Sequence, residues 1–247
     1  QEDLNTLAEW EKTWMMEFHP DKCKIISITR ARKPLIHKYT LHGQQLKQVD
    51  CVKYLGVKIN KDLRWDQHVN MVTSKANNSL NFLRRNIKIG NPVVKQHAYQ
   101  SLVRPILEYS QTVWDPHTVT LSNKVESIQR RAARFVTNRY RRTSSVSNML
   151  IQLEWQPLAE RRRIARNLMF YKIHYHHMAM NMPLQFKNLP SPTRTENSLA
   201  YVIPTSLTDY HRMSFYPRTV REWNLLPENV VCAGTPDSFR SALIRSI

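Results

Sequence analysis

The chain has 247 residues, 41% of them hydrophobic, so it is long enough to bury a core as one large domain or two smaller ones. Lysine and arginine number 37 against 19 acidic residues, and the net charge of +18 favours a polyanionic partner, either nucleic acid or an anionic membrane surface. No apolar run approaches the roughly 20 residues of a membrane span, and no signal-peptide core opens the chain, so we expect a soluble, intracellular protein without a membrane partner.

The composition also disfavours two kinds of ligand site. The cysteines, Cys23, Cys51 and Cys232, form no CxxC pair, which argues against a disulfide framework and a zinc knuckle. The chain has four glycines and neither GxGxxG nor GxxxxGK[ST], so no glycine-rich phosphate loop is expected. Because the chain starts with Gln1, already inside a helical pattern, we interpret it as a piece of a longer protein.

The chain opens with a predicted helix and a predicted strand. Apolar residues recur at helical spacing from Leu4 to Phe18, and Pro20 ends the pattern. The β-branched run KIISIT at 24–29 is typical of a short strand.

Two glycines mark the β-structure that follows. Gly43 predicts a tight turn between two strands within 39–46. The run 49–60 alternates between apolar and polar residues, but the alternation changes phase beside Gly56. A glycine at such a break indicates a bulge or a close backbone approach.

The segment 61–142 is predicted to be helical. Apolar residues share one helix face over 62–88, and the Asn-Pro pair at 91–92 is a typical start for the next helix. Pro105 is expected to kink or divide that helix, and the Asp-Pro pair at 115–116 to end it.

The last helix of this segment has the clearest pattern. Its apolar stripe consists of Leu121, Val125, Ile128, Ala132 and Phe135. Arg130, Arg131 and Arg134 lie on the opposite flank, and Arg84 and Arg85 end the helix at 62–88. A helix that buries one side and presents three guanidinium groups on the other is suited to a polyanion. The alternative is a solvated face, and for Arg84 and Arg85 a favourable interaction with the helix dipole.

The main boundary is placed within a basic and polar run at 139–145, and the C-terminal segment is 143–247. Pro157 opens another helix, whose first turns carry Arg161, Arg162, Arg163 and Arg166. Arginines near the positive end of a helix oppose its dipole, so this arrangement is unfavourable without an anion or nearby carboxylates.

The remainder is predicted to be irregular and α-rich. Proline and polar residues are frequent over 183–208, which we expect to be loop with one strand at 199–203. Short helices are expected at 217–226 and 236–247.

Two groups of residues have both a functional and a structural interpretation. His174, His176 and His177 could bind a metal, but without nearby cysteines or paired carboxylates surface histidines are the favoured interpretation. The tryptophans could stack on bases, but most lie within apolar patterns that favour core packing. They are Trp10, Trp14, Trp65, Trp114, Trp155 and Trp223.

The order of these pieces resembles the C-terminal part of the reverse transcriptases of non-LTR (LINE, jockey-like) retrotransposons. The matching stretches are LAEWEKTWMMEFHPDKCKII at 7–26, VKYLGVKINKDLRWDQHV at 52–69, LVRPILEYSQTVWDP at 102–116, VESIQRRAARFV at 125–136, LEWQPLAERRRIARNLMFYKI at 153–173 and FYPRTVREWNLLPENVV at 215–231. Six separate matches in the same order make the resemblance specific, and it covers nearly all of the chain.

The resemblance implies three parts. Residues 1–60 correspond to the tail of a polymerase palm with a primer-grip-like hairpin at Tyr54, Leu55 and Gly56, 61–142 to the helical thumb, and 143–247 to a post-thumb region. The expected fold is therefore mainly α: a helical thumb-like bundle with a small N-terminal helix, an antiparallel β-hairpin remnant of the palm, and an irregular α-rich C-terminal region.

The family's catalytic carboxylates lie upstream of the part that this chain resembles. No Asp-Asp pair occurs in the 247 residues. Because phosphoryl transfer of this type needs two metal ions held by clustered carboxylates, we expect no polymerase activity from this chain alone and no cofactor in it. Magnesium is expected only for the complete polymerase.

The resulting hypothesis is a catalytically incomplete piece of an RNA-directed DNA polymerase that binds RNA or an RNA/DNA hybrid duplex and contacts the upstream palm and fingers. The residues predicted to contact nucleic acid are Tyr54, Leu55, Gly56, Arg84, Arg85, Arg130, Arg131, Arg134, Arg161, Arg162, Arg163 and Arg166. The alternatives are a non-enzymatic RNA- or DNA-binding protein co-opted from a retroelement and an inactive remnant. Nuclear residence is an expectation from the way such elements integrate.

Overall fold

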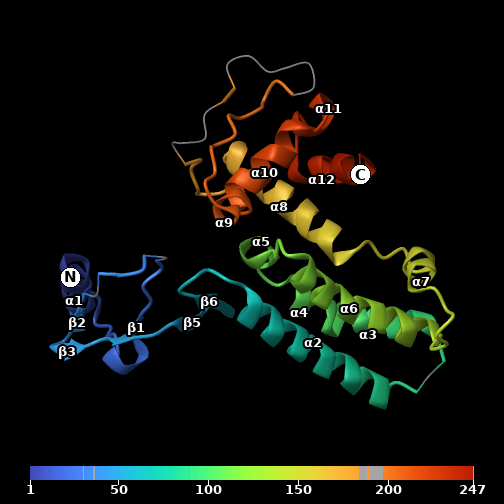
Figure 1. Ribbon diagram of the computed structural model, residues 1–247, viewed down its shortest axis with the longest axis horizontal. Coiled ribbons are helices and arrows are strands. Elements are labelled where there is room, and N and C mark those ends of the chain that lie inside the picture. The colour runs from blue at the N-terminus through green and yellow to red at the C-terminus, as the bar shows by residue number, and fades with distance from the viewer. Residues whose placement is uncertain (30, 36, 89, 184–187, 190–196, 247) are drawn as a thin grey trace. The chain divides into compact units, whose positions relative to one another are not determined.

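The computed structural model describes residues 1–247 except 30, 36, 89, 184–187, 190–196 and 247 (Figure 1). The described chain is mainly α with a few short strands, which confirms the predicted fold class. Its internal contacts divide it into two compact units, Gln1–Val72 (unit 1) and Thr73–Ile247 (unit 2). The predicted three-part division with boundaries after residues 60 and 142 stays a prediction.

Unit 1 combines one helix with short strands. Its elements are α1 (Glu2–Trp14), a 3-10 helix η1 (Pro20–Lys22), β1 (Lys24–Ile25), β2 (Thr40–Leu41), β3 (Gln44–Gln45), β4 (Lys47–Gln48), β5 (Cys51–Tyr54) and β6 (Val57–Asn60). The strand predicted over 24–29 is thus limited to two residues, which pair in parallel with β4.

The helix α1 is shorter than predicted because Met15 takes a left-handed conformation (φ 51°) and ends it. Glu11 is its one buried residue, and the Glu11 carboxylate accepts a hydrogen bond from the Phe18 backbone N–H. The other Glu11 oxygen lies 2.8 Å from His42 Nε2. A polar residue therefore connects α1 to the chain that follows it.

Two tight turns organise the strands of unit 1. Gly43 (φ 74°) follows His42 (φ 51°) between β2 and β3, which confirms the predicted turn. Leu55 (φ 45°) and Gly56 (φ 85°) likewise connect the antiparallel strands β5 and β6. Two successive positive φ angles are typical of the two-residue hairpin turn whose twist matches that of its strands. The change of phase at Gly56 is therefore a chain reversal and not a bulge, whereas the other interpretation, a close backbone approach, stays a prediction.

His68 attaches the first turn of α2 (Asp66–Asn86) to this hairpin, because its Nδ1 accepts a hydrogen bond of 3.1 Å from the Lys58 backbone N–H. His68 is 1% exposed, and burial lowers its pKa from 6.5 to about 4. The native state thus disfavours protonation of this imidazole.

The dependence of folding stability on pH should report the depressed pKa of His68. Because the folded-state pKa of His68 is depressed, its contribution to stability is fully present above pH 6.5 and is lost as the pH falls toward about 4. The loss should reach about 2–3 kcal/mol. Denaturant unfolding of the wild type and of His68→Asn, measured across this pH range, should show a shallower pH dependence for the variant; equal slopes would contradict the assignment.

Unit 2 contains the rest of α2 and all the following helices of the described chain. They are α3 (Pro92–Leu102), α4 (Arg104–Glu108), α5 (Gln111–Trp114), α6 (Val119–Thr137), α7 (Val146–Gln152), α8 (Leu158–His174), α9 (Asp209–Arg212), α10 (Phe215–Asn224), α11 (Glu228–Val231) and α12 (Pro236–Arg245). The predicted break at Pro105 is confirmed, since α3 ends before it and α4 begins at Arg104.

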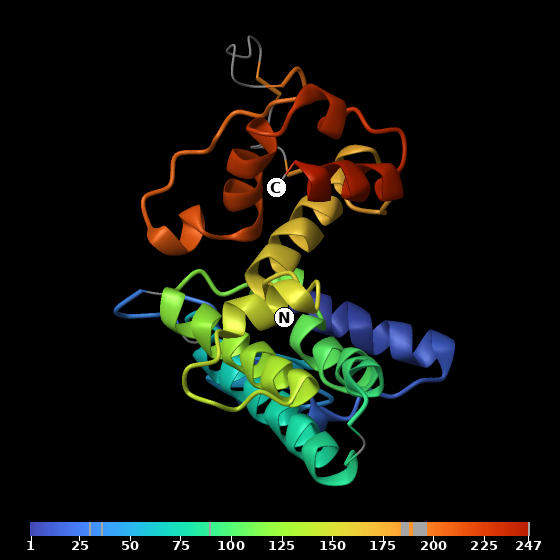
Figure 2. The same cartoon turned by 90° about the vertical axis from the view of Figure 1, so that its right-hand side faces the viewer.

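The helices α2, α3 and α6 lie side by side in both views (Figures 1 and 2). Tyr99 on α3 is fully buried, and its ring stacks on that of Trp155 with centroids 4.4 Å apart. The buried Gln129 of α6 accepts a hydrogen bond from the Tyr99 hydroxyl and donates one of 2.9 Å to the Gln156 carbonyl. These contacts connect α3 and α6 to the segment that precedes α8.

A second core lies among α8, α10, α11 and α12. Its centre is formed by Phe170, Trp223 and Phe239, each 0% exposed, with ring centroids 5.0 Å apart for the first pair and 5.8 Å for the second. Both side-chain groups of Asn224 bond to the backbone of Tyr201. The strand predicted at 199–203 is represented by one β-bridge, between Asn188 and Tyr201.

None of the described helices combines the length and apolar character needed to cross a membrane.

Candidate nucleic-acid interface

The helix α6 has one buried and one basic face. The buried residues are Val125, Ile128, Gln129, Ala132, Ala133, Phe135 and Val136. On the opposite side Arg130 and Arg131 are exposed and Arg134 is partly exposed. Arg131 Nη1 donates a hydrogen bond of 2.9 Å to Asn77 Oδ1, so this arginine lies beside α2. Within the described residues none of the three arginines forms an ion pair, so their charges are available to a ligand.

The C-terminal end of α2 adds further positive charge. Arg84 and Arg85 are exposed in its last turn. The Arg84 guanidinium carbon lies 5.7 Å from the ring centroid of Tyr140, the geometry of a cation–π contact. We refer to Arg84, Arg85, Arg130, Arg131 and Arg134 together as the basic face.

The predicted primer-grip residues lie at the tip of the β5–β6 hairpin. Tyr54 is 64% exposed and Leu55 is 73% exposed, and the turn places Gly56 next to them. Exposed apolar side chains at a turn are open to a ligand. The hairpin belongs to unit 1 and the basic face to unit 2, so the two are separate candidate contacts.

The four arginines of α8 are already engaged with carboxylates. Arg161 makes a two-point pair with Glu108, and Arg163 Nη1 lies 3.2 Å from Glu160. Arg162 Nε donates to Asp115 Oδ1 at 2.8 Å.

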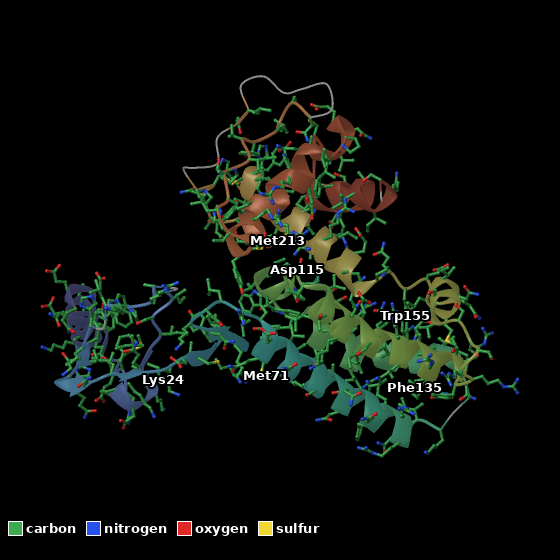
Figure 3. The ribbon with its side chains drawn as sticks, in the orientation of Figure 1. Lys24, Met71, Asp115, Phe135, Trp155 and Met213 are labelled. Carbon is green, nitrogen blue, oxygen red and sulfur yellow. The ribbon has the colours of Figure 1, made fainter. Side chains whose placement is uncertain are left out.

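Arg166 completes this arrangement, since its guanidinium donates to Asp115 and, at 2.5 Å, to Glu222 of α10. Asp115 also lies 3.1 Å from Arg218, and Figure 3 labels it at the end of α5, next to α8. Arg162 and Arg166 are each 1% exposed. We refer to Asp115, Arg162, Arg166, Arg218 and Glu222 as the buried ionic cluster.

The buried ionic cluster offsets the unfavourable interaction between the arginines of α8 and the positive end of its helix dipole. Asp115, directly after α5, and Glu222 of α10 supply the negative charge that arginines near a helix N-terminus require, and Glu108 of α4 does the same for Arg161 outside the cluster. Because buried guanidinium groups cannot reach a ligand without leaving these partners, α8 is the weakest part of the predicted interface. The contact predicted for its four arginines stays a prediction. The role of Asp115 is not predicted by its sequence context, in which the Asp-Pro pair at 115–116 indicates only the end of a helix.

The histidines and tryptophans separate into different environments. His174 Nδ1 lies 2.6 Å from the Tyr201 hydroxyl, and burial, with a smaller effect of His176, lowers the pKa of His174. No group of three histidine, cysteine or acidic residues in the described chain is arranged to hold a metal ion.

The prediction of core packing is confirmed for Trp114, Trp155 and Trp223, which are at most 8% exposed. The prediction of core packing is wrong for Trp14 and Trp10, whose side chains are exposed at 63% and 39%.

Comparison with known proteins identifies relatives among mobile elements. A stretch of 142 residues, 56% of this chain, is 28% identical to the probable RNA-directed DNA polymerase from transposon BS of Drosophila melanogaster and covers 16% of that protein. The RNA-directed DNA polymerase from mobile element jockey of the same species is 23% identical over 158 residues, which are 61% of this chain and 17% of the relative. Its counterpart from Drosophila funebris is 25% identical over 154 residues, or 59% of this chain and 16% of the relative.

The matched stretches thus span less than a fifth of the length of each relative. No family model and no solved structure matches the chain. The three relatives agree with one another and with the resemblance carried by the sequence motifs. The chain is therefore a relative of the RNA-directed DNA polymerases of jockey-like non-LTR retrotransposons.

Proposed function

We propose that the chain binds a nucleic-acid duplex, RNA or an RNA/DNA hybrid, through the basic face, as the part of a reverse transcriptase that holds template and primer. The observation that carries this proposal is a contrast between two groups of arginines. Those of α8 are paired with carboxylates, whereas Arg130, Arg131 and Arg134 form no ion pair within the described chain. Unpaired cations on one side of a rigid helix are suited to a row of phosphates.

The proposed contact is to the phosphate backbone. Guanidinium groups that neutralise phosphates position a protein on a duplex but do not distinguish one base sequence from another. The expected binding is therefore tolerant of sequence and sensitive to salt. Nucleotidyl transfer is not proposed for this chain, because its sequence has no Asp-Asp pair; the magnesium ions would belong to the complete polymerase.

A further proposed partner is the palm and fingers part of the polymerase. The helix α1 and the two residues that follow it expose large apolar side chains, which are between 39% and 95% exposed: Leu7, Trp10, Trp14, Met15 and Met16. Apolar side chains gathered on one helix are typical of an interface with another protein surface. The relatives are more than five times as long as the stretches that match, so they have additional polypeptide that could cover such a surface.

A salt titration tests the proposed duplex binding. The purified chain is mixed with a short labelled RNA/DNA hybrid, and the dissociation constant is measured by fluorescence anisotropy at several salt concentrations between about 50 and 200 mM. If all five cations of the basic face neutralise phosphates, the slope of log K against log salt should approach about −4 to −5. The absence of binding at the lowest salt concentration would falsify the proposal.

A further inference from the structure

A pocket of about 510 Å³ lies at one end of unit 2, between the last turn of α2, the first turn of α3 and the C-terminal end of α6. Phe135, labelled in Figure 3 on α6, is one of the residues that line it. Its volume lies within the range of sites that enclose small ligands, which is about 300–1,000 Å³. A single nucleotide therefore fits such a pocket, whereas a duplex does not.

The lining of the pocket is strongly cationic. It includes Arg84, Arg85, Lys88 and Lys95, and none of the described lining residues is acidic. Two amide side chains, those of Asn81 and Asn138, supply further hydrogen-bond donors. Four positive charges without a counter-charge repel one another, so a bound anion would stabilise the arrangement.

Lys95 is the residue that points most directly to a ligand. It is 6% exposed, and its ammonium forms no hydrogen bond or ion pair among the residues that the structure describes. Its Nζ lies 5.1 Å from the centroid of the Phe135 ring, which stabilises a cation only partly. Lys95 also lies in the first turn of α3, where the helix dipole disfavours a positive charge. Because most of the side chain is buried and lines the pocket, an anion bound there would offset the partial desolvation of the ammonium.

An aromatic ring borders the cations. Tyr140 is 51% exposed, and Arg84 approaches its ring at 5.7 Å. Asn138 ends α6 in a left-handed conformation (φ 54°), and Tyr140 follows two residues later. An exposed aromatic ring beside a cationic groove is the combination that binds single-stranded nucleic acid, because the bases stack on the ring while the cations contact the backbone.

We propose that this pocket holds one nucleotide of a single strand that extends beyond the duplex, with its phosphate among Arg84, Arg85, Lys88 and Lys95 and its base against Tyr140. The inference rests on the proposed duplex binding, because Arg84 and Arg85 belong to both the basic face and the pocket. A single strand is required because a base that is paired and stacked in a duplex cannot turn toward the ring.

The test compares the full 247-residue chain on two hybrids, one blunt and one with a short single-stranded overhang. The overhang should lower the dissociation constant by about fivefold or more, the effect of one base stacked on an aromatic ring. Tyr140→Leu and Lys95→Met should each remove most of this advantage and leave blunt-end binding within about twofold of the wild type. Tyr140→Phe should keep the advantage, because the ring is retained.

Two controls separate the pocket from general effects. Lys172→Met removes the same charge from α8, outside the pocket, and should leave the overhang advantage unchanged. Circular dichroism of each variant tests whether it folds. If Lys95→Met does not fold, Tyr140→Leu still tests the pocket, because Tyr140 is exposed. An overhang made of abasic nucleotides should give a smaller advantage than one with bases.

The outcomes distinguish this inference from the proposed duplex binding. Equal affinity for blunt and overhanging hybrids, or an advantage that survives Tyr140→Leu, overturns the nucleotide pocket and leaves duplex binding intact. An abasic overhang that performs as well as a normal one overturns the stacking role of Tyr140. A chain that binds neither hybrid at low salt overturns both proposals.

Discussion

Replacing Asp115 with alanine is expected to lower the free energy of unfolding of unit 2 by about 3–5 kcal/mol, because it removes the anion at the centre of three arginines. The Asp115 carboxylate is 2.8 Å from Arg162 and 3.1 Å from Arg218, and it also accepts a hydrogen bond from Arg166. Burial, with the nearby Arg166 charge, already lowers the pKa of Arg218. Urea unfolding followed by circular dichroism measures the loss.

Two comparisons test whether burial of the cluster is the cause. Asp209→Ala breaks the pair with Arg212, whose side chains are 71% and 50% exposed, and should cost less than about 1 kcal/mol. Adding Arg162→Met and Arg166→Met to Asp115→Ala should recover part of the stability, because uncharged side chains need no counter-ion. Equal losses for Asp115→Ala and Asp209→Ala would show that the buried ionic cluster is energetically ordinary.

The cluster also shows which features of a fold are accessible from sequence. The position of Arg130, Arg131 and Arg134 opposite the buried side of α6 was predicted because its cause is local: apolar residues repeat every three to four positions, so the helix separates them from the arginines. Arg162 and Asp115 are 47 positions apart in the chain, and Arg166 and Glu222 are 56 apart. No local pattern connects them, so an unfavourable helix start could be recognised while its partners could not.

The hairpin at Gly56 illustrates a different limit. A glycine beside a change in alternation is compatible with a bulge and with a two-residue turn. A bulge inserts an extra residue into one strand, and a turn inserts two residues between two strands, so either can shift the apolar alternation. The positive φ angle of Leu55 decides in favour of the turn, and nothing in the identity of a leucine predicts it. The resemblance to polymerases, which implied a hairpin at this position, supplied the information that periodicity lacked.

The tryptophans show how burial depends on the surrounding polypeptide. Trp114 and Trp223 are both 0% exposed, whereas Trp14 is 63% exposed although it lies in an equally apolar helical pattern. Periodicity reports that a helix face is apolar but does not report what covers it. The exposed face of α1 is consistent with the proposed interface with the palm and fingers.

Changing Arg130, Arg131 and Arg134 together to glutamine is expected to weaken hybrid binding by about a hundredfold or more near 0.1 M salt and to reduce the magnitude of the salt slope by about 2.7. Each arginine that neutralises one phosphate contributes about 0.9 to the slope, because it releases a condensed counter-ion. Glutamine keeps a polar, hydrogen-bonding side chain with a similar helix propensity, so the main change is the loss of charge. The measurement is the dissociation constant of the labelled hybrid at several salt concentrations.

A matched variant excludes a general effect of net charge. Arg212, Arg240 and Arg245, changed together to glutamine, remove the same three positive charges from α9 and α12, away from the basic face. If phosphates bind at α6, this control should keep a slope close to that of the wild type, because only released counter-ions enter the slope. Similar reductions in both triple variants would show that the chain attracts nucleic acid through its overall charge of +18, and the basic face would lose its assigned role.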